Sequence, residues 1–224
     1  MINLDDTGAF YWTLDLPAEE RPGGRVQVAL KRGLDVAGAA VLLLLTSPVL
    51  LGAMALVRLT SRGPAIFVQP RIGFGCRQFP MLKLRTMVHG AEGREEELAA
   101  ARPERTFLKI PRDPRITPVG RWLRRYSVDE LPQLLNVLRG EMSLVGPRPL
   151  LLSDFEKYPK RAQMRRFSVR PGLTGLWQVG GRSDLADSER VRLDLEYVDR
   201  WSLSLDLEIL SRTLPAVVSA KGAT

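Results

Sequence analysis

The sequence predicts an α+β fold that is mostly helical and attached to a membrane. Three observations support this prediction: an uncharged apolar run at residues 36–57, two strand-like runs on either side of a glycine-rich turn at 73–75, and helix-prone segments in much of the rest. With 224 residues, 45% of them hydrophobic, the chain can bury a core. We expect three parts: a disordered acidic leader at 1–24, a membrane helix at 25–62 and a cytoplasmic domain at 63–224.

The net charge of +8 is unevenly distributed along the chain. The leader holds five acidic side chains and one arginine, so the rest of the chain is more basic than the total suggests. A basic body indicates phosphate-rich partners, and nucleic acid, anionic lipid and a nucleotide substrate all meet that description. The single cysteine, Cys76, excludes an intramolecular disulfide and fits a reducing compartment.

The apolar run at residues 36–57 is long enough for a membrane helix. Its 22 residues would reach about 33 Å as a helix, against a hydrocarbon core of about 30 Å. A cleaved signal peptide is the alternative, because Ala53-Met54-Ala55 resembles a cleavage site. However, the run is longer than a usual signal-peptide core, contains a proline and follows an acidic leader. We therefore favour an uncleaved membrane element.

Pro48 lies just past the middle of this run and should kink or break the helix, because it has no N–H for the i→i−4 hydrogen bond. Ser47 can hydrogen-bond the backbone groups that the proline frees, which makes a break tolerable in lipid. Basic side chains flank both ends of the run: Arg25, Lys31 and Arg32 before it, Arg58 and Arg62 after it. Because basic flanks prefer the cytoplasmic side, this pattern favours a re-entrant helix over a kinked single span. Both alternatives place the basic body in the cytoplasm.

Two apolar runs within residues 65–87 predict a β-hairpin that turns at Gly73-Phe74-Gly75. Short helices are expected at 118–125 and 128–139, and a proline-rich surface loop at 102–118.

Two later segments are expected to be amphipathic helices. Residues 154–167 mix basic and aromatic side chains, which suits a helix lying on anionic headgroups as well as a solvated surface helix. Near the C-terminus, apolar side chains recur at helical spacing and should form the packed face of the last helix: Leu203, Leu207, Leu210, Leu214 and Val217.

The main cluster of reactive side chains lies within residues 121–136. Ser127 and Glu130 have the spacing of a helix capping box, and acidic residues suit the first turn of a helix, so the pair Asp129-Glu130 could be purely structural. Four arginines surround this pair in the sequence: Arg121, Arg124, Arg125 and Arg148. Such a cluster repels itself unless a multiply charged anion lies within it, and a diphosphate meets that requirement.

Two adjacent carboxylates among cations can have separate chemical tasks. The arginines and the helix dipole should favour an ionised Asp129, which can attack phosphorus to give an acyl phosphate. A carboxylate oxygen can also hold Mg²⁺, which bridges phosphate oxygens. The sequence contains no Walker A loop, His/Cys metal cluster or Ser-His-Asp set, and the lone His89 is expected to be structural or on the surface.

Seven motifs follow one another along the chain: Lys31-Arg32-x-Leu34-Asp35, Ser47-Pro48, Lys83-Leu-Arg-Thr-Met87, Asp113-Pro-Arg-Ile-Thr117, Ser127-Val-Asp-Glu-Leu-Pro-Gln133, Glu141-Met-Ser-Leu-Val-Gly-Pro-Arg-Pro149 and Arg170-Pro-Gly-Leu-Thr-Gly175. In this order they resemble the bacterial sugar transferase family, the monotopic polyprenyl-phosphate phosphoglycosyl transferases. The resemblance covers roughly residues 25–220 and is strongest to undecaprenyl-phosphate galactose and glucose phosphotransferases.

The resemblance implies a specific reaction. In this family a UDP-sugar gives its phosphosugar to the Asp of an Asp-Glu dyad and releases UMP, and undecaprenyl phosphate then accepts the group. The dyad matches Asp129 and Glu130, with Asp129 as nucleophile and Mg²⁺ ligand. The family's phosphate-handling positions match Arg124, Arg148 and, more weakly, Lys83. Three neighbouring cations are further phosphate-binding candidates: Arg121, Arg125 and Arg85.

The resemblance also implies a re-entrant helix broken at Ser47-Pro48, at the cytoplasmic face of the inner membrane, with lipids and no nucleic acid as partners. Larger relatives carry additional transmembrane helices, so this chain is expected to be the catalytic module alone. Residues 173–185 look most like the same segment of family members that use galactose or glucose 1-phosphate. UDP-galactose is therefore the favoured donor. Arg170 and Arg182 are candidates for donor binding, with a surface role as the alternative. The sequence leaves the oligomeric state open, a homodimer included.

Two rival hypotheses belong to other functional classes. A basic, membrane-anchored binding protein would explain the charge and the apolar run, but it leaves Asp129-Glu130 unexplained. A soluble nucleotide-sugar enzyme with a buried apolar helix is the other, and solubility without detergent would favour it.

Overall fold

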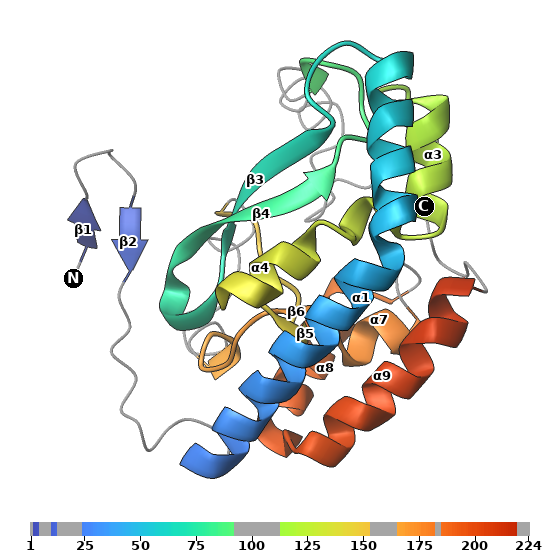
Figure 1. Ribbon diagram of the computed structural model, residues 1–224. Coiled ribbons are helices and arrows are strands. Elements are labelled where there is room, and N and C mark those ends of the chain that lie inside the picture. Colours follow the sequence, from blue (N-terminus) through green and yellow to red (C-terminus); the bar gives the residue numbers. More distant parts are fainter. Residues whose placement is uncertain are drawn as a thin grey trace.

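The computed structural model describes six parts of the chain: residues 2–4, 10–12, 24–91, 113–152, 165–181 and 185–218. Helices form most of the regular structure in these parts, and the strands pair into two-stranded sheets (Figure 1). The predicted mostly helical α+β class is confirmed. Several predictions concern residues outside the described parts: most of the leader, residues 102–112 of the loop expected at 102–118, residues 154–164 of the helix expected at 154–167, and Arg182.

Within the leader, β1 (Ile2–Leu4) and β2 (Phe10–Trp12) pair as antiparallel strands. The disorder expected for the other leader residues stays a prediction.

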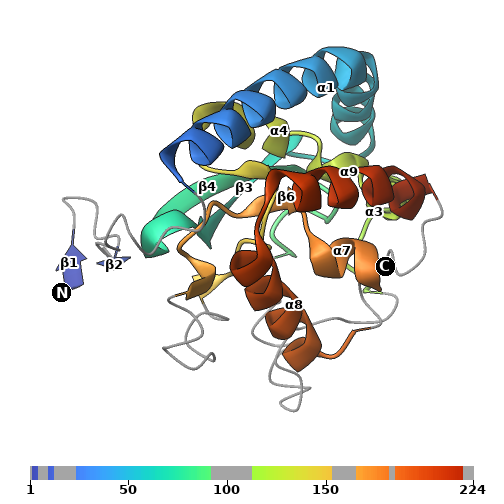
Figure 2. The same ribbon diagram turned by 90° about the horizontal axis from the view of Figure 1, so that it is seen from below.

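Helix α1 (Arg25–Thr60) contains the whole apolar run and Pro48. It stays helical through the proline, although its direction changes partway along its length (Figures 1 and 2). The carbonyl of Leu44 loses its usual partner at Pro48, and Ser47 Oγ donates to that oxygen at 2.7 Å. The expected repair of the freed backbone group by Ser47 is therefore confirmed, while the expected break is a bend in a continuous helix.

One face of α1 packs on the rest of the protein, and the opposite face is apolar and exposed. The buried face is formed by Asp35, Ala39, Leu50, Ala53 and Val57. The exposed face carries large apolar side chains: Leu30, Val41, Leu44, Leu45, Leu51 and Leu59. By length and composition α1 could cross a membrane. A contiguous apolar surface of this kind marks contact with lipid or protein.

The predicted β-hairpin is confirmed. Strands β3 (Ile66–Ile72) and β4 (Gln78–Leu84) pair antiparallel, and the one-turn 3₁₀ helix η2 (Phe74–Cys76) joins them. Gly75 takes a left-handed conformation in this turn (φ 63°), which glycine adopts without strain. The hairpin places the end of β4, which carries Lys83, against the helices that follow it in the sequence.

Helix α3 (Pro118–Arg125) begins where the sequence predicts, because Thr117 caps it and Pro118 occupies its first turn. The second predicted helix is divided into the 3₁₀ turn η4 (Val128–Glu130) and helix α4 (Gln133–Arg139). Pro132, the N-cap of α4, starts the second helix, and Gly140 ends it in a left-handed conformation.

The C-terminal part begins with a parallel pair of strands and ends with helices, of which α9 lies beside α1 (Figures 1 and 2). The elements are β5 (Ser143–Val145), β6 (Gly172–Thr174), α7 (Leu176–Gly180), α8 (Asp187–Arg200) and α9 (Leu203–Val218). The main core joins α1, β4, α4, β5, α8 and α9 through buried side chains that include Ala39, Met81, Leu134, Met142, Tyr197 and Ile209.

The predicted packing face of α9 is partly wrong. Leu207 and Leu214 are 60% and 70% exposed, whereas Asp206 and Ile209 are buried. The polar Asp206 turns inward because Lys31 of α1 and Tyr197 of α8 bind its carboxylate. This orientation of α9 turns Leu207 and Leu214 towards the outside.

Candidate active site

Asp129 and Glu130, which we call the dyad, meet three cations that come from separate elements. Lys83 Nζ of β4 lies 3.3 Å from Glu130 Oε1, and Arg148 Nη2 of the loop after β5 lies 3.5 Å from the same oxygen. Arg124 of α3 acts electrostatically on both carboxylates. We call Lys83, Arg124 and Arg148 the cationic cluster. The structure therefore joins positions predicted from three separate motifs.

The backbone between α3 and α4 places the dyad. Ser127 takes a left-handed conformation (φ 55°) after α3 ends, and this turns the chain into η4. The capping-box interpretation of Ser127 and Glu130 is wrong, because the Ser127 side chain makes no capping hydrogen bond and Glu130 contacts Lys83 and Arg148. Glu130 is thus used in the ion-pair network rather than for the helix end.

Arg124 is held by the end of β4. Its Nε donates to Thr86 Oγ1 at 2.9 Å, and the Thr86 carbonyl accepts from the backbone N–H of Thr117 at 3.0 Å. Close approach of α3 to this strand requires a glycine at position 120, because a Cβ there would lie 2.0 Å from the Thr86 carbonyl oxygen. Thr86 and Gly120 therefore decide which arginine of α3 faces the dyad. Thr86 belongs to the motif at 83–87, but neither residue was predicted to take part in the site.

Asp129 is 8% exposed, and its charge environment differs from the expectation. Burial, with Glu130 adding to it, raises the pKa of Asp129, while Lys83, Arg124 and Arg148 oppose the shift. The expectation that arginines and a helix dipole lower this pKa is wrong in direction, because desolvation outweighs them. The same desolvation lowers the pKa of Lys83 and of Arg124. The site is thus a poorly hydrated cluster of opposite charges.

The structure gives the other predicted site residues different contacts or an exposed position. Arg85 Nη2 donates to the carbonyl and the Oγ of Ser61 at 2.9 Å each, so Arg85 holds the end of α1 rather than the dyad. Arg121 and Arg125 are exposed on α3. Arg170 Nε donates to the Gly140 carbonyl at 2.9 Å. His89 is exposed, as expected.

Trp177 is a further residue of the site that the sequence analysis did not select. Arg148 Cζ lies 5.5 Å from the centroid of its ring system, and Arg190 Cζ of α8 lies 5.4 Å from it. A tryptophan face attracts guanidinium groups through its quadrupole. Trp177 thus supports the side chain of Arg148, which no local sequence pattern could indicate.

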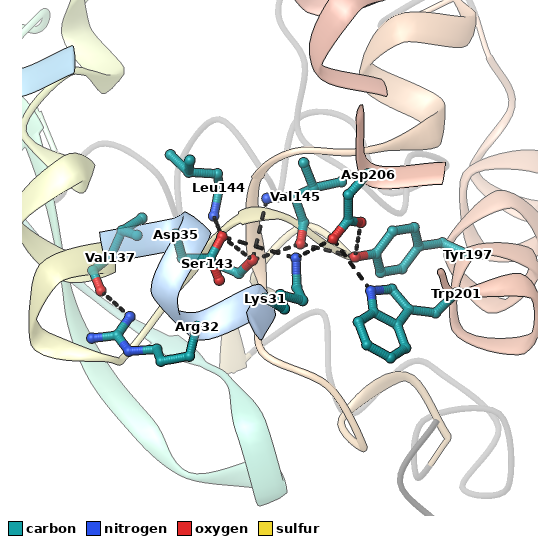
Figure 3. Close-up of polar contacts among 10 residues, drawn as sticks. All are labelled: Lys31, Arg32, Asp35, Val137, Ser143, Leu144, Val145, Tyr197, Trp201 and Asp206. Carbon is teal, nitrogen blue, oxygen red and sulfur yellow. Dashed lines mark hydrogen bonds and ion pairs between the residues drawn. The ribbon is translucent and has the colours of Figure 1, made fainter. Parts of the chain in front are cut away.

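The first turns of α1 are fixed to the same domain by buried polar contacts (Figure 3). Lys31 Nζ lies 2.6 Å from Asp206 Oδ2, and Arg32 Nη1 donates to the Val137 carbonyl at 2.6 Å. Asp35 Oδ1 accepts from Ser143 Oγ at 3.0 Å and from the Leu144 N–H at 2.9 Å, which ties α1 to β5. With Arg85 holding Ser61 at the other end, both ends of α1 are attached to one domain.

The dyad offers an incomplete set of metal ligands by itself. Within the described parts of the chain, no three His, Cys, Asp or Glu side chains gather closely enough to hold a metal ion. Mg²⁺ usually keeps several waters and binds through one or two carboxylates together with substrate phosphates. The donor set of Asp129 and Glu130 fits that manner of binding.

Comparison with known proteins gives a consistent result. The profile of a family described as bacterial sugar transferase matches residues 26–220. The chain is 46% identical over 198 residues to the exopolysaccharide production protein ExoY of Rhizobium meliloti, covering 86% of this chain and 87% of the relative. It is 45% identical over 214 residues to a UDP-glucose:undecaprenyl-phosphate glucose-1-phosphate transferase of Caulobacter vibrioides, covering 91% of this chain and 76% of the relative. An undecaprenyl-phosphate galactose phosphotransferase of Salmonella typhimurium is 41% identical over 200 residues, which are 87% of this chain and 41% of that relative.

Proposed function

This chain belongs to the bacterial sugar transferase family, and we propose that it moves a hexose 1-phosphate from a UDP-sugar to undecaprenyl phosphate. The chain is a sugar-phosphate transferase, and relatives named for the transfer of glucose 1-phosphate or galactose support the choice of hexose. UDP-galactose is the favoured donor. The lipid-linked product would start the assembly of an exopolysaccharide or O-antigen type glycan, in line with the relative named for exopolysaccharide production.

One observation carries this proposal: the buried carboxylate of Asp129 lies within a cluster of three cations. Glu130 neutralises only part of the positive charge of these cations, through its ion pairs with Lys83 and Arg148. A diphosphate brings negative charge and acceptor oxygens for the cationic cluster, while Asp129 supplies a nucleophile. In a protein that only bound anions, a second carboxylate at this site would not strengthen binding.

In the first proposed step, an Asp129 carboxylate oxygen attacks the phosphorus bonded to the sugar. The bond between this phosphorus and the bridging oxygen breaks, and the electron pair leaves with UMP. In the second step, an oxygen of undecaprenyl phosphate attacks the same phosphorus, and the acyl phosphate bond breaks to restore the Asp129 carboxylate. One phosphoanhydride is exchanged for another, so neither step needs ATP.

The side chains of the site have separate tasks in this scheme. A raised pKa makes the ionised Asp129 more basic and a better nucleophile. Lys83, Arg124 and Arg148 stabilise charge on the transferring phosphoryl group, and burial keeps water away from the acyl phosphate. Mg²⁺, held at Asp129 beside Glu130, would neutralise charge on the diphosphate when bound.

The attachment of α1 at both ends supports a re-entrant position in the cytoplasmic leaflet of the inner membrane. Lys31 and Arg32 at one end, and Ser61 at the other, contact the same domain. A straight span would separate these ends by the thickness of the hydrocarbon core, about 30 Å. The change of direction partway along α1 (Figures 1 and 2) and the exposed leucines of its central turns fit a helix that enters the membrane and returns. The exposed Leu207 and Leu214 of α9 fit an amphipathic helix at the interface.

The experiment that tests the function measures UMP release by the purified full chain with undecaprenyl phosphate, Mg²⁺ and a series of UDP-sugars. Wild type should release UMP, fastest with UDP-galactose or UDP-glucose. Asp129→Asn should fold normally and lose turnover by at least about 10³-fold, because an amide is a poor nucleophile. Near-normal turnover in this variant would refute the role of Asp129. Donor binding without UMP release by wild type would favour an anion-binding protein instead.

A further inference from the structure

Both peptide groups of Arg148 are held by one buried ion pair. The backbone N–H of Arg148 donates to the carboxylate of Asp194 in α8. Its carbonyl accepts a hydrogen bond from Arg166 Nη2. The same Nη2 lies 2.9 Å from Asp194 Oδ2, so the three residues form a closed polar ring.

The carbonyls on either side of Arg148 have partners of their own: Pro147 accepts from the Gly172 N–H at 2.8 Å, and Pro149 accepts from Arg71 Nη1 at 3.4 Å. Pro147 and Pro149 have no N–H, so the amide of Arg148 is the one backbone donor of this tripeptide. Pro149 also restricts the conformation of Arg148. With its donor and acceptor both engaged, Arg148 has a defined backbone direction from which the side chain leaves towards Glu130 and Trp177.

Stability alone does not explain a charged pair at this place. The side chains of Arg166 and Asp194 are 6% and 3% exposed. A buried ion pair of this kind is often no better for stability than well-packed apolar side chains of similar volume. Charged groups do supply strong hydrogen bonds of fixed direction, and here those bonds end on the residue that contacts the dyad.

We propose that Arg166 and Asp194, the Arg148 clamp, are positioning residues that direct the guanidinium of Arg148 onto the substrate phosphate beside Glu130. The clamp rests on the proposed function, in which Arg148 stabilises the transferring phosphoryl group. Both clamp side chains are buried, so they would act on the reaction through Arg148.

Two variants separate positioning from folding. Asp194→Asn keeps the shape and an acceptor oxygen but removes the charge that orients Arg166. The double variant Arg166→Met with Asp194→Leu replaces the pair by apolar side chains of similar size, which should preserve the fold. Each is made in the wild-type and in the Arg148→Ala background, so that coupling to Arg148 is measured directly. Glu189→Gln, which removes an exposed carboxylate of the same helix paired with Arg192, is the matched control.

The double variant should keep its thermal midpoint and lower kcat/KM for the UDP-sugar by about tenfold or more, the effect of a lost charged hydrogen bond. In the Arg148→Ala background the same change should cost less than about threefold, since the group it positions is absent. Hydrogen exchange of the Arg148 amide should be faster in the double variant and unchanged in Glu189→Gln.

Three results would overturn the clamp: full activity in a folded double variant, an equal loss in both backgrounds, or unchanged exchange at the Arg148 amide. Hydrogen exchange needs no turnover. If wild type releases no UMP, the proposed function fails, while faster or unchanged exchange still decides whether the ion pair fixes this backbone.

Discussion

The carboxylate of Asp129 combines two properties that oppose each other. Burial and the neighbouring Glu130 raise its pKa, and Lys83, Arg124 and Arg148 keep the ionised form accessible. A carboxylate that is both poorly hydrated and electrostatically supported can react with phosphorus and then serve as a leaving group. The chemistry we propose depends on this balance, so changes to single cations should affect rate more than folding.

Arg124→Ala tests the contribution of one member of the cationic cluster. We expect kcat/KM to fall by about 10²–10³-fold, because a preorganised cation at the phosphoryl group is lost. UMP release measures this effect. The matched control is Arg139→Ala, an exposed arginine near the end of α4, which should retain more than half of the activity. Equal losses in the two variants would show that general basicity, not the placement of Arg124, matters.

Asp194 should give folding stability a distinct pH dependence. Burial raises the pKa of Asp194 from 3.8 to about 6, against the opposing effect of Arg166 and Arg148. The folded state therefore holds this proton more tightly than the unfolded state does. Its stabilising contribution is complete below about pH 4 and is lost as the pH rises through about 6.

Comparison of wild type with Asp194→Asn isolates this effect, because the variant cannot titrate there. Between pH 4 and pH 7, the free energy of unfolding of wild type should fall relative to that of the variant by about 2–3 kcal/mol. Chemical denaturation in detergent at several pH values measures it. A relative gain in wild-type stability across this range would contradict the raised pKa.

Among the elements, helix α1 links membrane attachment to the active site. Asp35 binds the N–H of Leu144 in β5, and the loop that follows this strand carries Arg148. At the other end, Arg85 binds Ser61, and the adjacent Thr86 holds Arg124. Each end of α1 is thus connected through a short segment to one member of the cationic cluster.

The position of α1 in the membrane is tested by labelling single cysteines at positions 25 and 62. Both should react with a membrane-impermeant maleimide in inside-out vesicles and be protected in intact spheroplasts, because a re-entrant helix keeps both ends in the cytoplasm. The background variant Cys76→Ala removes the native cysteine, which is buried. Labelling of the two positions from opposite faces would show that α1 crosses the membrane.

Local sequence signals predicted those elements whose turns or ends are set by neighbouring residues. The Gly73-Phe74-Gly75 turn indicated the hairpin, and Thr117-Pro118 fixed the start of α3. The inward face of α9 was not predictable from its own spacing, because the partner that buries Asp206 is Lys31, 175 residues away in the sequence.

The same limit holds for the site. The arginine pattern by itself did not separate Arg124 from Arg121 and Arg125, and only the family resemblance favoured Arg124, since Thr86 and Gly120 make that choice in three dimensions. Trp177 and Asp194 act on Arg148 from other elements, and no local motif reveals such contacts. Desolvation of Asp129 likewise follows only from the assembled fold.

At the scale of the whole molecule, the function that we propose requires one domain to join a water-soluble donor to a lipid acceptor. The exposed apolar face of α1 suits lipid, while the cationic cluster suits a nucleotide diphosphate. Both ends of α1 are fixed to the domain that carries the dyad, so in the proposed re-entrant position the active site would be held at a defined height above the membrane. In the reaction that we propose, one carboxylate would then receive the phosphosugar from the cytosolic side and pass it to the lipid.

The most direct test of this account is intact-protein mass spectrometry after incubation with UDP-galactose and Mg²⁺ in the absence of undecaprenyl phosphate. We predict that a fraction of the wild-type protein gains one hexose phosphate, that peptide mapping places it on Asp129, and that added undecaprenyl phosphate removes it. Asp129→Asn should gain none. If an enzyme preparation that turns over carries no adduct, or carries it on another residue, the covalent role of Asp129 is contradicted.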